Sequence, residues 1–105
     1  MVPLQLDVQL ALSVGESAHI DLADGSIRLT SFSSSTAIMP SVYRPIWQAI
    51  LDHCTGEQTI ERYIQMNSIG EDKKEEAREE VIDVIRFLIN RGFIYAGAES
   101  LFDSE

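Results

Sequence analysis

Three short segments in the first third of the chain alternate apolar and polar residues, which is the pattern of strands with one buried face. They are residues 4–10, 18–22 and 26–32. Asp24 and Gly25 lie between the second and third segments and favour a tight hairpin, because both residues tolerate positive φ. The alternation directs Ala18, Ile20 and Leu22 inward, with His19 and Asp21 outward. The pattern predicts a three-stranded antiparallel sheet, which needs a helical layer against it to be stable.

Helical spacing begins after residues 33–36, a polar stretch that is expected to be a connector. Ser41 is a suitable N-cap, and Pro45 is tolerated because it falls in the first turn. The first helix is expected to run to about Cys54, with Gly56 as its C-terminal stop. A second short helix is expected to start at residue 58 or 59 and to end at residues 67–70.

The third helix is expected to start at Glu71 and Asp72, acids that suit the positive end of the helix dipole. It ends before Gly92, a residue that commonly terminates helices. Residues 93–95 form a short extended piece, and residues 96–105 form a flexible acidic tail. The expected fold is therefore one α+β domain over residues 1–95, a three-stranded antiparallel sheet followed by a three-helix bundle.

The net charge of −9 argues against nucleic-acid binding, because such affinity comes mostly from Lys and Arg on phosphates. The same charge disfavours anionic membranes. No apolar run reaches the roughly 18–20 residues that would span a bilayer. Residues 1–7 contain an acid and no base, unlike a signal peptide, so the expected location is the cytoplasm.

Catalysis has little support in the sequence. His53 and Cys54 are neighbours on a helix and point about 100° apart, a poor arrangement for a nucleophile and its base. Two histidines and one cysteine with scattered acids do not form a metal site, and no phosphate-binding glycine motif is present. We expect a non-catalytic protein without a cofactor.

Binding of an extended peptide is the alternative that the expected fold favours. A small sheet has exposed edges, and an edge strand offers free N–H and C=O groups to a further strand. If the third helix lies beside the third strand, the two form a groove. The edge can equally be covered by the tail or by a second copy of the chain.

Three motifs resemble the PqqD family, the small proteins of pyrroloquinoline quinone biosynthesis and the related recognition elements of ribosomal peptide-modifying systems. They are the hairpin at Asp21–Leu29, the turn Thr55-Gly56-Glu57-Gln58-Thr59-Ile60, and the helix stop Gly92-Phe93-Ile94. The resemblance covers roughly residues 4–95. The chain departs from the family pattern in the approach to the first helix, Ile38–Pro45, and in the connector before it.

The resemblance implies a winged helix-turn-helix-like fold that binds the leader of a precursor peptide and presents it to a modifying enzyme. The leader would add as a strand to the third strand, over the third helix. The strand residues implied are Ile27, Arg28, Leu29, Thr30, Ser31 and Phe32. The helix residues implied are Lys74, Arg78, Val81, Ile82 and Ile85, of which the last three also suit the core. Arg28, Lys74 and Arg78 would pair with acids of the leader.

Two other classes stay open at this point. The turn and the helix stop also occur in winged-helix DNA-binding regulators. A domain that only forms a homodimer through its sheet edge would show the same pattern.

Overall fold

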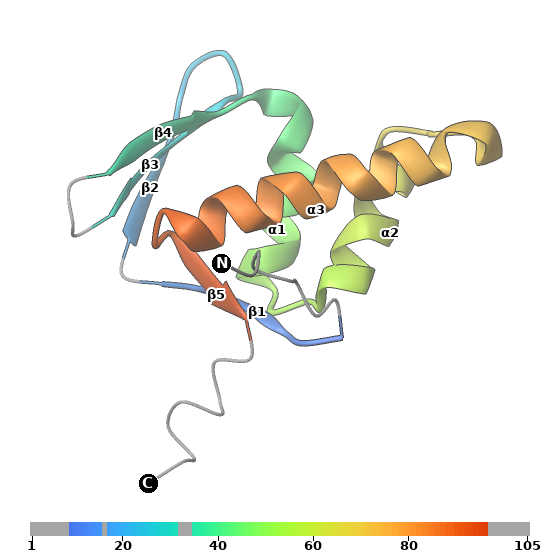
Figure 1. Cartoon of the computed structure of the whole chain (residues 1–105). Coiled ribbons are helices and arrows are strands. Elements are labelled where there is room, and N and C mark those ends of the chain that lie inside the picture. Colours follow the sequence, from blue (N-terminus) through green and yellow to red (C-terminus); the bar gives the residue numbers. More distant parts are fainter. Residues whose placement is uncertain (1–8, 16, 32–34, 97–105) are drawn as a thin grey trace, which may run out of the picture.

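The structure is a computed structural model that describes residues 9–15, 17–31 and 35–96. It has a mixed α+β fold with a three-stranded antiparallel sheet and three α-helices, as the sequence predicts at this level (Figure 1). The strands are β1 (Leu12–Val14), β2 (Ser17–Asp21), β3 (Ile27–Ser31), β4 (Thr36–Met39) and β5 (Ile94–Ala96). The helices are η1 (Ser41–Tyr43), α1 (Arg44–Leu51), α2 (Gly56–Met66), η2 (Glu71–Lys73) and α3 (Lys74–Asn90).

The three-stranded sheet has the order β2-β3-β4. Its first two strands, β2 and β3, correspond to the second and third expected strands, and its third strand lies later in the chain than expected. The hairpin of β2 and β3 is confirmed, with Gly25 in its turn at φ 92°. The expected first strand, residues 4–10, lies mostly outside the described residues, and Gln9 and Leu10 belong to no strand. The third strand is β4, which shares only Thr36 with the expected connector and otherwise covers residues for which no strand was expected. Its Ala-Ile-Met run pairs with β3 and ends at Pro40.

The side chains of β2 face the opposite way from the prediction. Ile20 is exposed and pairs with Arg28, while His19 pairs with Leu29 and contacts the Trp47 ring, 5.5 Å between centroids. The alternation of β3 is as expected, with Ile27 and Leu29 buried and Arg28 and Thr30 exposed. Because His19 is paired with Leu29 and Ile20 with Arg28, the register with β3 decides which face of β2 lies over the core. Tertiary pairing therefore overrides the local pattern of β2.

A second, two-stranded sheet joins the two ends of the described chain. β1 pairs with β5 antiparallel, with Leu12 opposite Ala96 and Val14 opposite Ile94. The expected extended piece after α3 is therefore confirmed. Gly15 passes so close to the chain after α3 that a Cβ there would lie 3.2 Å from the carbonyl oxygen of Gly92. Glycine suits this crossing because it has no side chain.

The boundary between α1 and α2 lies earlier than predicted. α1 ends at Leu51, and Gly56 opens α2 instead of closing α1. Thr55 is the N-cap: its hydroxyl accepts a hydrogen bond from the Gln58 N–H at 3.1 Å, and the Gln58 side chain accepts one from the Thr55 N–H. This capping box satisfies two backbone donors at once and fixes the start of the helix.

One core joins the sheet to the helices. The inner face of the sheet supplies Ile27, Leu29 and Met39, and the helices pack against it through α1 and α3. Trp47 is the largest fully buried side chain. The remaining buried members, from β1, the helices and the end of the described chain, are Leu12, Ile46, Ile50, Ile60, Tyr63, Ala77, Val81, Ile85, Leu88, Phe93 and Ile94. In Figure 1 α3 is the longest helix, and its C-terminal half lies beside the sheet.

Candidate functional site

The outer edge of β4 is the feature from which the candidate site is built. The Ser31 N–H donates to the Ser35 carbonyl at 2.9 Å, which makes this a hydrogen-bonded pair. Such pairs alternate along antiparallel strands, so the pairs Leu29–Ala37 and Ile27–Met39 are also hydrogen-bonded. The backbone N–H and C=O groups of Thr36 and Ile38 therefore point away from β3. Within the described residues no other strand pairs with β4.

A groove of about 570 Å³ runs between this edge and α3. This volume falls in the range of about 300–1,000 Å³ that is common for binding sites. One wall is β4 with the residues that follow it, and the other wall is a stripe of α3. The residues that line the groove are Leu29, Ala37, Ile38, Met39, Pro40, Tyr43, Glu76, Glu79, Glu80, Asp83, Val84, Phe87 and Leu88.

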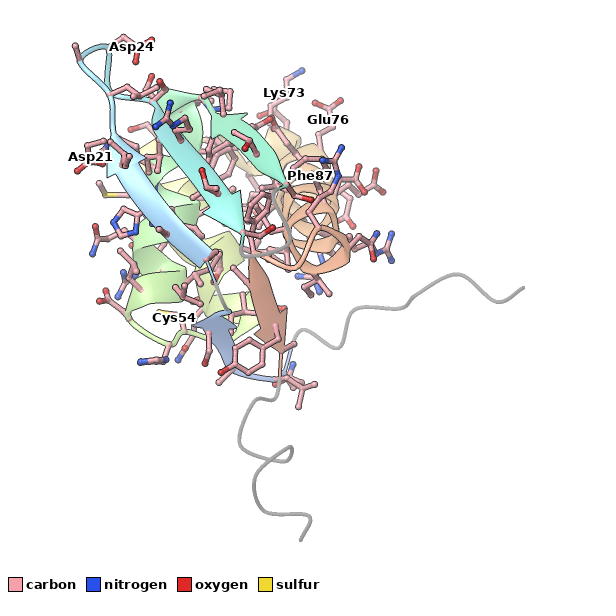
Figure 2. The ribbon with its side chains drawn as sticks, turned by 90° about the vertical axis from the view of Figure 1, so that its left-hand side faces the viewer. Asp21, Asp24, Cys54, Lys73, Glu76 and Phe87 are labelled. Atoms are coloured by element: carbon pink, nitrogen blue, oxygen red, sulfur yellow. The ribbon has the colours of Figure 1, made fainter. Side chains whose placement is uncertain are left out.

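Two large apolar residues of the groove are exposed to solvent. Phe87 on α3 is 42% exposed. Ile38 on β4 is 54% exposed, but it is paired with Arg28, so its side chain lies on the outer face of the sheet while its backbone groups border the groove. In Figure 2, Phe87 lies beside the start of β4, and Glu76 lies further along α3 on the same side. Asp21, by contrast, lies on β2 at the opposite edge of the sheet. The groove therefore offers apolar area and free backbone groups on adjacent surfaces.

The carboxylate of Glu80 is held in place by two tyrosines. The Tyr43 hydroxyl donates to Oε2 at 2.6 Å, and the Tyr63 hydroxyl donates to Oε1 at 3.2 Å. The hydrogen bond to Glu80, with partial burial, raises the pKa of Tyr43 to about 12. Burial, with the nearby Glu80 charge, raises the pKa of Tyr63 as well. Both hydroxyls therefore stay protonated at neutral pH and keep donating to the carboxylate.

The α3 wall of the groove is acidic. Glu76, Glu79, Glu80 and Asp83 line it, and no Lys or Arg is among the lining residues. Lys73 lies 3.9 Å from Glu76, a weak contact between two exposed side chains. At the other end of the groove the Arg91 guanidinium lies over the Phe87 ring, 4.9 Å from its centroid.

The strand expected to receive a peptide, Ile27–Phe32, is central instead of being an edge. β3 pairs with β2 on one side and with β4 on the other, so both rows of its backbone groups are used. Phe32 lies outside the described residues. Ile27, Leu29 and Ser31 are buried, and Arg28 and Thr30 face solvent on the outer face of the sheet. Of these residues only Leu29 lines the groove.

The expected helix residues also lie away from the groove. Val81 and Ile85 are fully buried in the core, and Ile82 packs against it. Lys74 and Arg78 line a second hollow of about 460 Å³ between α2 and α3. There Arg78 forms a two-pronged ion pair with Glu57 at 3.0 Å, and Lys74 pairs with Glu71 at 3.0 Å.

Sequence reasoning missed the groove residues for an identifiable reason. Because the prediction takes residues 4–10 as the first of three strands, its third strand is residues 26–32, and it assigns no strand to Thr36–Met39. The signal that could have located the wall is the spacing of Glu76, Glu80, Asp83 and Phe87. These positions repeat every three or four residues and so form one stripe of a helix.

Comparison with known proteins gives no relative: no family model, curated protein or solved structure matches the chain. Among the described residues, no helix is long and apolar enough to cross a membrane.

Proposed function

We propose that this protein is a non-catalytic peptide-recognition domain that captures the leader of a ribosomal precursor peptide and presents it to a modifying enzyme. The observation that carries the proposal is the outer edge of β4, which no other described strand pairs with, beside a groove lined by apolar and acidic side chains. Strand addition is the recognition mode that uses such an edge, because backbone hydrogen bonds give affinity and the adjoining pockets give specificity.

The dimensions of the groove suit a short extended segment. From Glu76 to Phe87 the helix axis rises by about 16 Å, which is the length of about five residues of strand. Thr36 and Ile38 together offer two N–H and two C=O groups, enough for four backbone hydrogen bonds. The face that a bound strand of this length turns toward α3 would cover the exposed part of Phe87, and its outer face would lie beside Ile38.

The resemblance to the PqqD family supports the same function, with one change of strand. The expectation placed the leader between the third strand and the third helix, and in the sheet the third strand is β4. We infer a winged helix-turn-helix-like arrangement on the same grounds. The domain would act in the cytoplasm, where ribosomal precursors are made, together with an enzyme that modifies the captured peptide.

A proline substitution at the edge tests the proposal. In Ile38→Pro the outward N–H is lost, while the ladder to β3 is kept because Ile38 does not donate to β3. The matched control is Ile38→Val, which keeps the N–H and most of the side chain. Thermal unfolding of both variants shows whether the fold is preserved.

The probes are synthetic peptides that correspond to the short open reading frames next to the gene, titrated into isotope-labelled protein. We expect one of them to shift the amide signals of Thr36–Met39 and of Val84–Leu88. Ile38→Val should bind that peptide and a folded Ile38→Pro should lose it. Shifts confined to α1 and α2, or equal binding by the two variants, would show that strand addition at β4 is wrong.

A further inference from the structure

We propose that the strand bound at β4 carries lysine or arginine on the face that it turns toward α3, followed by an apolar residue opposite Phe87. This inference rests on the proposed function and names the chemistry of the peptide. It reverses the expectation of an acidic leader, since the three basic residues on which that expectation relied lie outside the groove.

The charge of the groove is the first argument. Four carboxylates line it without a single basic lining residue. For Glu79 and Asp83, the described residues supply no ion-pair partner. Glu80 is fixed by Tyr43 and Tyr63 but receives only neutral hydroxyl donors, so its negative charge is not compensated there. A cationic side chain would find a preformed, negatively charged wall.

The spacing of the wall is the second argument. Side chains on one face of a strand are about 6.7 Å apart, and Glu76 and Glu80 are about 6 Å apart along the helix axis. Two successive inward residues of the bound strand would therefore face the Glu76–Asp83 part of the wall. The next inward residue would reach Phe87, where the ring and the stacked Arg91 favour an apolar group.

The same charges exclude the occupants that the chain itself could supply. Residues 1–8 and 97–105 contain four acids and no Lys or Arg, namely Asp7, Glu99, Asp103 and Glu105. A second copy that paired β4 with β4 would bring two acidic walls next to each other. Like charges in such a juxtaposition oppose association, so we assign the groove to a different, cationic chain.

Three capped synthetic peptides of nine residues test the inference. In each peptide, threonine occupies every odd position, and the four even positions are valine, two identical test residues and leucine, in that order. The test residue is lysine in the first peptide, glutamine in the second and glutamate in the third. Calorimetry gives Kd, and amide shifts of the protein show where each peptide binds. We expect the lysine peptide to bind about tenfold more tightly than the glutamine peptide, from two partly exposed ion pairs. The glutamate peptide should be weakest, and the differences should shrink as salt rises.

A pair of charge variants separates the groove from the general negative charge of the protein. Glu79→Lys/Asp83→Lys reverses two charges of the groove wall, and neither residue has an ion-pair partner in the described structure. The control Glu61→Lys/Glu75→Lys makes the same change of net charge in the second hollow. The groove variant should lose the preference for the lysine peptide, because two lysines then offset the charges of Glu76 and Glu80, whereas the control should still prefer the lysine peptide.

Each outcome decides between the two proposals. Equal affinities for the three peptides with shifts at β4 would overturn the cationic preference and leave strand addition standing. A preference for lysine that both double variants lose equally would also overturn it, because the attraction would then be unspecific. If no peptide, at concentrations up to the millimolar range, shifts the amides of β4, strand addition itself fails and the inference fails with it.

Discussion

Replacing Tyr43 by phenylalanine should weaken the fold at neutral pH but not at strongly alkaline pH. The Tyr43 hydroxyl donates to Glu80, and this raises its pKa from the ordinary value near 10 to about 12. Two pKa units correspond to at most about 2.7 kcal/mol. Because the pair is partly exposed to solvent, screening reduces this, and we expect Tyr43→Phe to lower the unfolding free energy by about 1 kcal/mol at pH 8.

The pH dependence follows from the raised pKa. Below pH 10 the hydroxyl is protonated in both folded and unfolded chains, so the hydrogen bond contributes fully to stability. Between pH 10 and 12 the unfolded chain loses its proton first, and the contribution falls as pH rises. The difference in stability between the natural protein and Tyr43→Phe should therefore shrink across this interval.

Urea unfolding at a series of pH values measures this difference directly. Tyr95→Phe on β5 is the matched control, because Tyr95 has no hydrogen bond to a carboxylate in the described structure. The ultraviolet absorbance of the phenolate gives an independent readout: Glu80→Gln should return the titration of Tyr43 toward pH 10. If Tyr43 of the natural protein already titrates near pH 10, Glu80 does not hold the hydroxyl and the reasoning is refuted.

Two further substitutions test the fold on which the groove depends. Thr55→Ala removes the capping box of α2 and should cost about 1 kcal/mol in urea unfolding, with Thr55→Ser close to the natural protein. Equal losses in both would contradict the capping role. Ile85→Ala should cost about 2–5 kcal/mol because Ile85 is fully buried, whereas Ile82→Ala, at the margin of the core, should cost clearly less. The reverse order would contradict the burial of Ile85 in the core.

The features of the fold that depend on local sequence were predictable. The hairpin follows from Asp24 and Gly25, and the long third helix follows from its apolar spacing and from Gly92. The coarse class, a three-stranded antiparallel sheet with three helices, was predicted for the same reason. The sequence allows two roles for Val81 and Ile85, lining a groove or packing in the core. A helical stripe shows which residues share a face but not what covers that face.

The features that depend on distant pairing were not predictable. Strand register and neighbours are decided by contacts across the chain, and a short apolar run such as Ala37–Met39 carries little periodic signal of its own. The prediction therefore takes residues 26–32 as an edge strand, whereas among the described strands β3 is central and β4 is an edge. The sequence places the predicted groove between the third helix and residues 26–32, whereas in the structure β3 is central and the groove beside α3 is lined by β4 and by acidic side chains.

The β1–β5 sheet has a consequence for which parts of the fold depend on each other. It joins the first described strand to the last, with Leu12 opposite Ala96. Residues 10 and 11 continue from it to the start of α2, where the Gly56 N–H donates to the Leu10 carbonyl and Ala11 bridges Thr55. Figure 1 shows the β1–β5 pair below the three-stranded sheet, away from the outer edge of β4. A substitution that weakens the β1–β5 pairing is therefore expected to loosen the attachment of α2 and α3 to each other without altering the edge of β4 directly.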